Sequence, residues 1–250
     1  MKQGGRKILF FGLLLGFWQG LYALKIWPGF LFPSPEEVAG KLVGGFRDGT
    51  FLLGIGASMA RLISGYGISL VLGIGLGLMV GCVKWLDDTL GVLLLALQTL
   101  PSICWLPLAL LWFGLNEKAI LFMVVIGAAL SISLAAEDGV RNVPPLFIRA
   151  ARNLGARGWR LYLQVIFPAA FPSIVTGMKL GWSFAWRALM AAELLYGNVG
   201  LGELLSMGRE LNDMAQVLSV MIVIILLGLG VDRIVFSRLE RNVRLRWGTA

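Results

Sequence analysis

Hydrophobic residues follow one another in long runs, and short polar segments separate these runs. A helix needs about 20 apolar residues to cross the hydrocarbon core of a bilayer, and six runs reach or approach this length. The pattern predicts an all-α, polytopic membrane protein with about six transmembrane helices. The predicted spans lie at about residues 8–24, 62–83, 89–113, 119–136, 171–194 and 214–236.

The first run leaves two interpretations open. Lys2, Arg6 and Lys7 precede it, as cations precede the apolar part of a signal peptide. No clear small-residue cleavage site follows, however, and the segment 25–28, Lys-Ile-Trp-Pro, is typical of a membrane interface. We therefore expect an uncleaved span, with a cleaved signal as the alternative.

A mixed segment, residues 28–50, follows the first span. Ser34 suits a helix cap, Pro35 suits the first turn, and two acids come next, where the helix dipole favours them. The segment predicts a short amphipathic helix outside the bilayer. The next apolar run, Phe51–Val83, is too long for one upright span, so we expect its first part to lead into the membrane from outside.

Small residues and prolines mark particular positions in the spans. Gly73, Gly77 and Gly81 recur every fourth residue and suit close helix packing, although glycine is common in membrane helices in general. Pro101 and Pro107 interrupt the third span and predict a kinked or broken helix.

The composition agrees with a membrane protein. Hydrophobic residues make up 58% of the 250 residues and charged residues only 14%, which argues against soluble, disordered and fibrous classes. Six spans place both termini on one side, together with fourteen Lys and Arg residues, against five on the other side. The positive-inside rule then makes both termini cytoplasmic. This topology accounts for the net charge of +8 without a nucleic-acid partner.

The chain lacks the residues of several common chemistries. It has no histidine, and its two cysteines, Cys82 and Cys104, lie in apolar runs, which argues against a His/Cys metal site and a Ser-His-Asp triad. It also lacks the glycine-rich Gly-x4-Gly-Lys-Ser/Thr loop that binds nucleotide phosphates. We therefore expect no enzyme activity and no cofactor in this chain.

The longest polar stretch, Glu137–Pro168, carries a spaced motif. It reads Arg-Ala-Ala at 149–151, three residues, Gly155, nine residues, and Val-Ile-Phe-Pro at 165–168. It resembles the EAA loop of binding-protein-dependent ABC importer permeases, Glu-Ala-Ala, three residues, Gly, nine residues, Ile-x-Leu-Pro. The spacing matches throughout. Arg149 reverses the charge of the family's Glu, and this departure puts any contact made through that carboxylate in doubt.

Further segments resemble the nitrate/sulfonate/taurine/bicarbonate branch of these permeases. Together they span residues of about 30–247. They are Leu31–Pro35, Pro107–Leu108, Trp112–Gly114, Ala192–Leu194, Gly200–Gly202 and Asp232–Arg233.

The resemblance implies a type I ABC importer permease fold, as a single transmembrane domain over 1–250 with a cytoplasmic coupling loop at about 137–168. It implies that the chain passes a small solute, such as nitrate, bicarbonate or a sulfonate, into the cytoplasm across the bacterial inner membrane. The implied partners are ATPase subunits that bind ATP and Mg, an extracytoplasmic substrate-binding protein, the lipid bilayer and a second permease copy, with a homodimer expected.

Residues of the loop suggest how an ATPase would grip it. Pro145 suits a helix start, and Gly155 stands where a left-handed helix end would fall. The alternative is an ordinary surface helix in a basic loop. The expected ATPase-coupling residues are Phe147, Ala150, Ala151 and Leu154, which share one helix face, with Gly155 and Pro168.

The fifth span carries the candidates for a translocation pathway, because ionisable residues inside a span are costly and often functional. Arg187 either attracts an anion or pairs with Glu193 or with a residue of another span, and Lys179 is expected to snorkel toward the cytoplasm. A small-residue stripe, Ser173, Gly177, Gly181 and Ala185, is either a packing seam or a pore lining. The pathway candidates are Trp182, Trp186, Arg187 and Glu193.

Two other classes of protein remain as alternatives. A stand-alone secondary transporter or channel predicts repeated halves with paired broken helices, and the interruption at Pro101 and Pro107 has no counterpart in the second half. A membrane-embedded enzyme needs clustered acids or histidines facing a cavity, and the intramembrane acids are too few.

Overall fold

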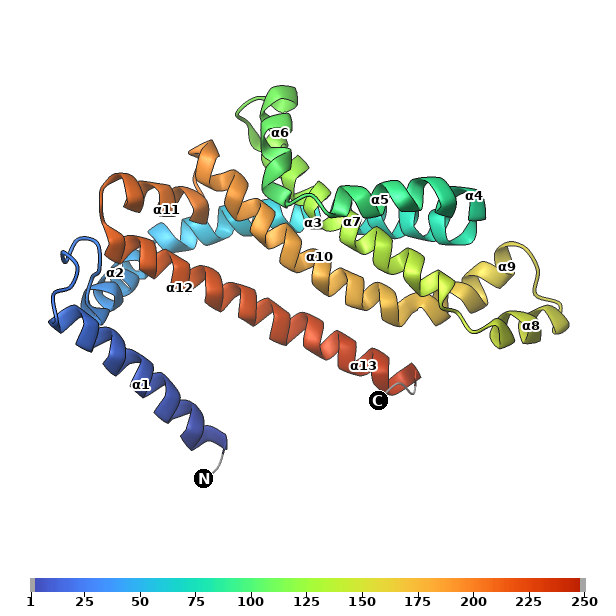
Figure 1. The fold of residues 1–250 in the computed structure, drawn as a ribbon, viewed down its shortest axis with the longest axis horizontal. Helices are drawn as coiled ribbons and strands as arrows, with labels where there is room; N and C mark the ends of the chain where they lie inside the picture. Colours follow the sequence, from blue (N-terminus) through green and yellow to red (C-terminus); the bar gives the residue numbers. More distant parts are fainter. Residues whose placement is uncertain (1–2, 248–250) are drawn as a thin grey trace. The chain divides into compact units, whose positions relative to one another are not determined.

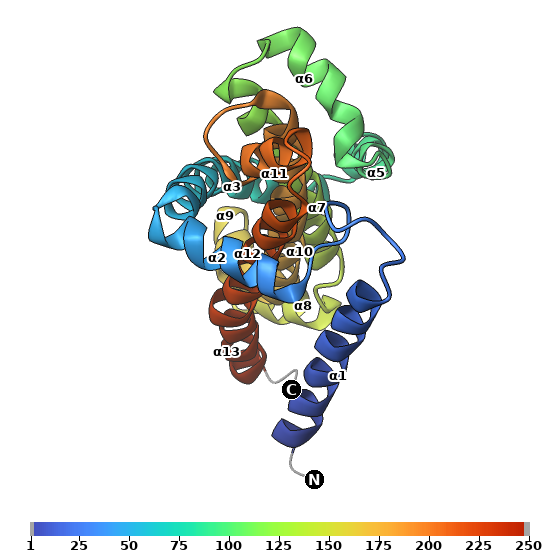
Figure 2. The same cartoon turned by 90° about the vertical axis from the view of Figure 1, so that its left-hand side faces the viewer.

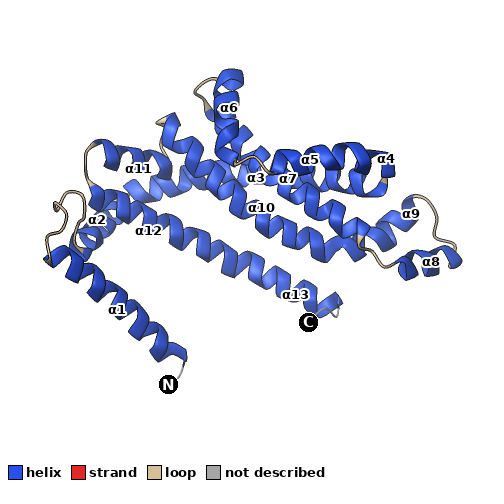
Figure 3. Cartoon of the chain, in the orientation of Figure 1, coloured by secondary structure: helices blue, strands red, loops and turns tan. Residues whose placement is uncertain are grey.

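The computed structural model describes residues 3–247, and within this part it consists of helices joined by loops (Figures 1 and 3). The all-α fold class is thereby confirmed. Lys2, one of the fourteen cations counted above, lies outside the described residues, as does the side chain of Arg244. The α-helices are α1 Gln3–Ala23, α2 Pro35–Arg47, α3 Thr50–Cys82, α4 Lys84–Leu86, α5 Val92–Gln98, α6 Leu106–Phe113, α7 Glu117–Arg141, α8 Pro145–Asn153, α9 Trp159–Leu161, α10 Phe167–Tyr196, α11 Leu201–Glu210, α12 Met214–Val231 and α13 Ser237–Trp247.

Short helical segments of other types connect some of these helices. Three of them are π-helical, a geometry that is rare and often found at functional sites. The π-helical turns are Asp87–Gly91, Tyr162–Ile166 and Asp232–Phe236. The remaining segment is the 3₁₀ turn Ser102–Trp105.

Within the described residues, four helical stretches are long and apolar enough to cross a membrane: Thr50–Cys82, Glu117–Arg141, Trp159–Tyr196 and Met214–Trp247. A fifth results if the bent pair Lys84–Gln98 and Ser102–Phe113 counts as one span. The helix α1 is not among them, although most of its apolar side chains are exposed. The sixth predicted span therefore remains a prediction.

The chain divides into two compact parts. The first part comprises residues 1–58 and 193–226, and the second comprises 59–192 and 227–250. The helices α3, α10 and α12 each contribute to both parts.

The helix α7 forms the core of the second part. Met123, Val124 and Ile132 on this helix are fully buried. The glycine stripe of α3 packs against it, because a side chain at Gly73 or Gly81 would collide with α7 residues. The stripe is therefore a packing face, as the spacing indicates.

The small-residue stripe of α10 also packs against α7, and the two helices run side by side in both views (Figures 1 and 2). A side chain at Gly177 would collide with Ala135, and one at Gly181 would lie 2.7 Å from Ile132. Of the two interpretations left open by the sequence, the structure supports the packing seam.

The third span is broken, as Pro101 predicts. Its two halves, Lys84–Gln98 and Ser102–Phe113, meet at an angle of 102°. Pro107 does not contribute a second kink, because it lies in the first turn of α6, where proline is tolerated.

In the first part, α2 begins as the sequence predicts. The Ser34 hydroxyl accepts a hydrogen bond from the Glu37 N–H at 3.2 Å, and the Glu37 carboxylate accepts one from the Ser34 N–H at 3.0 Å. The Ser219 hydroxyl, from α12, donates to the carbonyl of Val38 at 2.9 Å. A cavity of about 870 Å³ lies between α2, α11 and the starts of α3 and α12.

Several helices are longer than the hydrophobic pattern predicts. The helix α3 is continuous from Thr50, so the expected lead-in belongs to the same helix. The helix α7 continues to Arg141 and includes Glu137, which the sequence analysis assigns to the polar loop. The stretch Met214–Trp247 extends well past the predicted end of the last span.

Candidate functional site

The predicted coupling loop contains the helix α8, and Gly155 ends it as predicted. Gly155 has φ +86°, in the left-handed region that favours glycine. The Gly155 N–H donates to the carbonyl of Arg152 at 3.0 Å, and the Ala156 N–H donates to that of Ala151 at 2.9 Å. These two bonds form a Schellman motif, which satisfies carbonyls at the helix end.

The surface of α8 combines exposed and buried apolar residues. Phe147 and Leu154 are 52% and 89% exposed, and Ala150 lies exposed between them on the same face. Ala151 is only 8% exposed and packs in a cluster with residues such as Val143 and Ile166. The methyl group of Ala151 therefore lies in the permease's own core, apart from the exposed face of Phe147, Ala150 and Leu154, and its contact with an ATPase stays a prediction.

The end of the loop is held by the last described helix. The indole N–H of Trp247 donates to the carbonyl of Pro168 at 2.7 Å, and its ring stacks on Phe171 with centroids 5.7 Å apart. Lys179, which the sequence predicts to snorkel, lies 3.5 Å from Asp232 and 3.4 Å from Glu240. The loop is thus connected to the base of α10 and to α13.

The pathway candidates Trp182 and Trp186 on α10 each pack against neighbouring helices. Trp182 is buried in an aromatic cluster, 5.1 Å from the ring of Tyr66 and 5.8 Å from that of Phe236. Trp186 is half-buried beside Gly228 of α12. Packing therefore accounts for the positions of both tryptophans.

Arg187 is exposed, and its contacts lie within its own helix. Its Nε donates to the carbonyl of Ser183 at 3.1 Å, and its guanidinium lies 4.8 Å from the ring centroid of Phe184. Among the described residues it forms no ion pair.

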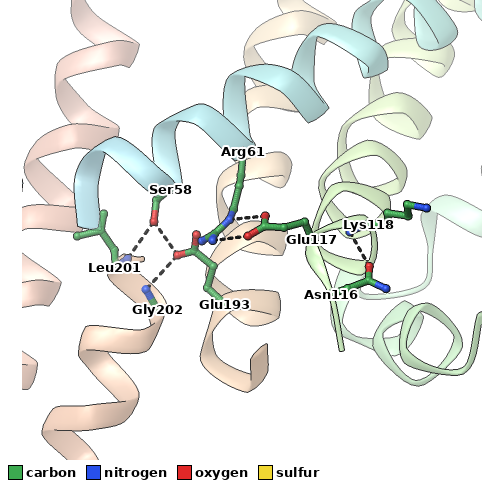
Figure 4. Close-up of polar contacts among 8 residues, drawn as sticks. All are labelled: Ser58, Arg61, Asn116, Glu117, Lys118, Glu193, Leu201 and Gly202. Carbon is green, nitrogen blue, oxygen red and sulfur yellow. Dashed lines mark hydrogen bonds and ion pairs between the residues drawn. The ribbon is translucent and has the colours of Figure 1, made fainter. Parts of the chain in front are cut away.

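Glu193 is 1% exposed and caps a helix that the sequence analysis does not predict, α11 (Figure 4). The Ser58 hydroxyl and the Gly202 N–H donate to its carboxylate at 2.7 and 3.1 Å, and the Leu201 N–H donates to Ser58 Oγ at 2.9 Å. Gly200, at the cap position, has no side chain to satisfy these N–H groups. Glu193 and Ser58 therefore do so from α10 and α3.

A further set of polar contacts lies at the start of α7. The Arg61 guanidinium donates to both carboxylate oxygens of Glu117, at 2.7 and 2.6 Å, and Asn116 accepts a bond from the Lys118 N–H at 2.8 Å (Figure 4). The bidentate pair joins α3 to α7 and was missed by the sequence analysis. The single charge of Arg61 within an apolar run was the signal that indicated a partner.

A search of the described residues for metal ligands finds no group of three or more Cys, Asp and Glu side chains that could hold an ion.

Comparisons with known proteins agree with the motif. The model of the family "Binding-protein-dependent transport system inner membrane component" matches residues 69–244. A putative ABC transporter permease protein, MJ0413 of Methanocaldococcus jannaschii, is 35% identical over 91% of this chain and 86% of its own.

Two further relatives have more specific names. The nitrate import permease protein NrtB of Synechocystis is 30% identical over 89% of this chain and 83% of its own. The taurine transport system permease protein TauC of Escherichia coli is 29% identical over 79% and 74%. These matches support the predicted branch and give no support to a stand-alone channel or secondary transporter.

A solved structure supports the fold. A chain of the MetNI methionine ABC transporter, in an inward-facing conformation, superimposes with a TM-score of 0.66, at 18% identity, over 78% of this chain and 96% of that one. The fold, the motif spacing and the family match agree, and the chain belongs to the family of membrane components of binding-protein-dependent ABC transport systems.

Proposed function

We propose that α8 is the element through which a separate ATPase, which binds ATP and Mg, drives this permease. The observation that carries the proposal is the exposed apolar face of Phe147, Ala150 and Leu154, which ends at a left-handed glycine. An apolar face outside the membrane spans requires a partner surface that removes it from water. The core cluster beneath Ala151 connects α8 firmly to the permease.

The charges around this face indicate the chemistry of the partner surface. Arg149, Arg152, Arg157 and Arg160 are exposed and form no ion pair among the described residues. Residues 139–192 contain no acid that could balance them. The ATPase groove therefore has an apolar floor and an acidic rim, and Arg149 meets a carboxylate there.

The substrate proposed for the importer is a small oxyanion delivered by an extracytoplasmic binding protein. Two relatives are named for nitrate and taurine, and nitrate and the sulfonate of taurine both present negatively charged oxygens. Two copies of this chain are proposed to form the membrane part, in the bacterial inner membrane.

The proposed topology places both termini and the loop 137–168 in the cytoplasm. The distribution of Lys and Arg supports it. In a background without Cys82 and Cys104, cysteines at Arg157 and Asn116 should react with impermeant reagents from opposite sides of the membrane. Labelling of both from outside would refute the six-span arrangement.

Gly155→Val tests the coupling function. A β-branched residue at φ +86° is strained, and no side chain lies within 4 Å to obstruct it, so the effect arises from the backbone alone. We expect the variant to insert normally but to lose ATPase on co-purification, or to leave ATP hydrolysis unresponsive to the loaded binding protein.

Three companion variants sharpen this test. Gly155→Asn tolerates the left-handed conformation and should retain coupling. Ala150→Trp should weaken ATPase binding by obstructing the exposed face, whereas Arg157→Ala should be milder. Full transport by both Gly155→Val and Ala150→Trp would rule α8 out as the coupling element.

Arg149→Glu tests the acidic rim. The reversal should weaken ATPase binding at low salt, and the salt dependence of binding should diminish because an attractive pair is lost. Arg238→Glu makes the same change at an exposed position of α13 and serves as the control. Equal ATPase binding by the wild type and Arg149→Glu across salt concentrations would contradict the proposed carboxylate.

A further inference from the structure

The break in the third span opens a cavity inside the second compact part. The cavity has a volume of about 220 Å³ and lies where Lys84–Gln98 and Ser102–Phe113 meet at 102°. Its wall combines the break with residues of α7 and one aromatic residue of α10. The lining residues are Gln98, Thr99, Leu100, Pro101, Ser102, Trp105, Ile126, Gly127, Leu130 and Phe184.

The cavity lies beside the middle of α7, a helix that is long and apolar enough to cross a membrane. The break divides a span whose polar neighbours are Lys84 on one side and Asn116 on the other. Gly127, in the opposite wall, lies near the middle of α7. In both walls the lining residues are therefore well separated along the sequence from the polar segments that end these helices.

Polar groups inside a bilayer need water or a solute. Backbone that is not helical is tolerated inside a bilayer only where it is buried in protein or lines a wet cavity. The Thr99 hydroxyl donates to the carbonyl of Ala96 at 2.7 Å and satisfies one freed group of α5. Gln98, Ser102 and Trp105, all half-buried, offer further N–H and O–H donors without a charge.

A positive charge lies directly behind one wall. Phe184 lines the cavity, and the guanidinium of Arg187 lies 4.8 Å from the centroid of its ring. Within the described part of the chain, no residue of the lining is charged. Arg187 therefore makes the potential in the cavity positive without coordinating its contents.

We propose, on the basis of the proposed import function, that this cavity is a transient site for a small oxyanion as it crosses the membrane. A water molecule takes about 30 Å³ of liquid volume, so 220 Å³ holds an anion of the size of nitrate with part of its hydration shell. Neutral donors with a distant cation bind the anion weakly, which suits a site that must release what it binds.

This proposal replaces the pathway predicted from the sequence. Trp182 and Glu193 belong to packing and capping, whereas Arg187 retains a role as a source of positive potential. The residues that the proposal adds to the pathway are Gln98 and Ser102, on either side of Pro101. The sequence analysis identifies Pro101 only as the cause of a kink or break.

The test measures which charge the cavity admits and needs no knowledge of the natural substrate. The permease–ATPase complex, with Cys82 and Cys104 replaced by alanine, carries Ser102→Cys in lipid nanodiscs. The cysteine reacts with either an anionic reagent, methanethiosulfonate ethylsulfonate, or its cationic trimethylammonium analogue. Each reaction rate is divided by the rate of the same reagent with a free thiol in solution. We expect the anionic reagent to be favoured, and Arg187→Gln to reduce this preference by about fivefold.

Ile103→Cys is the matched control. Ile103 is the next residue, is exposed and does not line the cavity. Lipid that covers this exposed position in the nanodisc should make a cysteine there react slowly with both reagents. If Ser102→Cys reacts no faster than Ile103→Cys, the cavity is closed and the proposal fails. If it reacts with both reagents alike and Arg187→Gln changes nothing, the cavity is a water-filled void and the proposal also fails.

Co-purification of the ATPase with these samples and with Gly155→Val separates this proposal from the coupling function. Co-purification of the ATPase with Ser102→Cys depends on α8 and not on the cavity. Intact co-purification without the anion preference would overturn the cavity site alone. Normal coupling in Gly155→Val would instead overturn the coupling function.

Discussion

Among the described residues two glutamates are buried, and they differ in how well their oxygens are satisfied. Glu193, 1% exposed, accepts hydrogen bonds from Ser58 and Gly202. Glu137, 6% exposed, has one oxygen 3.4 Å from Arg141, which also lies 3.3 Å from Asp87. Its other oxygen, Oε2, is buried and has no hydrogen-bond partner among the described residues.

The difference shows that burial of a carboxylate does not by itself reveal its role. A buried oxygen without a partner reduces stability, whereas a satisfied one connects the elements that donate to it. Glu193 therefore fixes α11 to α10 and α3. Glu137, at the end of α7 that leads into the proposed coupling loop, is expected to contribute less to stability.

Glu193→Ala should have the largest effect. It leaves the Ser58 hydroxyl and the Gly202 N–H buried without an acceptor, and we expect a loss of roughly 3 kcal/mol or more in the free energy of unfolding. Thermal unfolding of the purified complex measures it. Glu193→Gln keeps the shape and one acceptor oxygen, and should be less destabilised. A Glu193→Ala protein as stable as the wild type would remove the basis of the comparison.

Ser58→Ala should rank next, at about 1–3 kcal/mol, because one hydroxyl both donates to Glu193 and accepts from Leu201. Ser64→Ala is the control, since Ser64 is exposed on the same helix. Within the described part of the chain, its hydroxyl donates only to the carbonyl of Ala60, one turn earlier in that helix. Equal stability losses in the two variants would show that the hydrogen bonds to α11 contribute nothing specific.

Glu137→Gln should change the free energy of unfolding by less than about 1 kcal/mol, because it removes a charge that is poorly satisfied while Asp87 remains beside Arg141. The same thermal assay applies, with Glu193→Gln as the matched substitution. A loss from Glu137→Gln as large as that from Glu193→Gln would mean that the two sites are equivalent after all.

The exposed pair of Lys41 and Asp213 should have the smallest effect. Burial acts to raise the pKa of Asp213, but the bonds from Lys41 and from the Gln216 N–H outweigh it and leave the pKa below its ordinary 3.8. The pair therefore stabilises the folded state above pH 3.8 and loses this contribution as the pH falls through the lowered pKa.

Lys41→Met should accordingly cost less than about 1 kcal/mol at neutral pH, since both side chains are partly solvated. Its difference from the wild type should be constant from about pH 5 to about pH 8 and should shrink in stronger acid. A difference that grows on acidification would contradict the sign of the shift.

Features set by neighbours in the sequence were predicted correctly. The cap at Ser34, the break at Pro101 and the left-handed end at Gly155 each follow from a residue's own backbone preferences. These rules act within a few residues, so one sequence suffices to apply them.

Features set by distant contacts were not predicted. A glutamate near the end of an apolar run has the same local pattern whether or not it caps another helix, so the sequence alone did not show that Glu193 caps α11. Ala151 shares an arc of α8 with Phe147, and only the packing beneath the helix shows which of them is buried. Gly200 was the available clue to α11, because a helix that starts at glycine needs an acceptor from elsewhere.

The continuous helix from Met214 to Trp247 also serves as a molecular ruler. Its 34 residues span about 51 Å at 1.5 Å per residue, whereas the hydrocarbon core is about 30 Å thick. If this helix stands upright, about 20 Å of it extends beyond the hydrocarbon core. The Trp247 indole N–H at its end donates to the carbonyl of Pro168, at the foot of the proposed coupling loop. A spin label at the exposed Leu245 would report the movement of that loop during ATP turnover without altering α8.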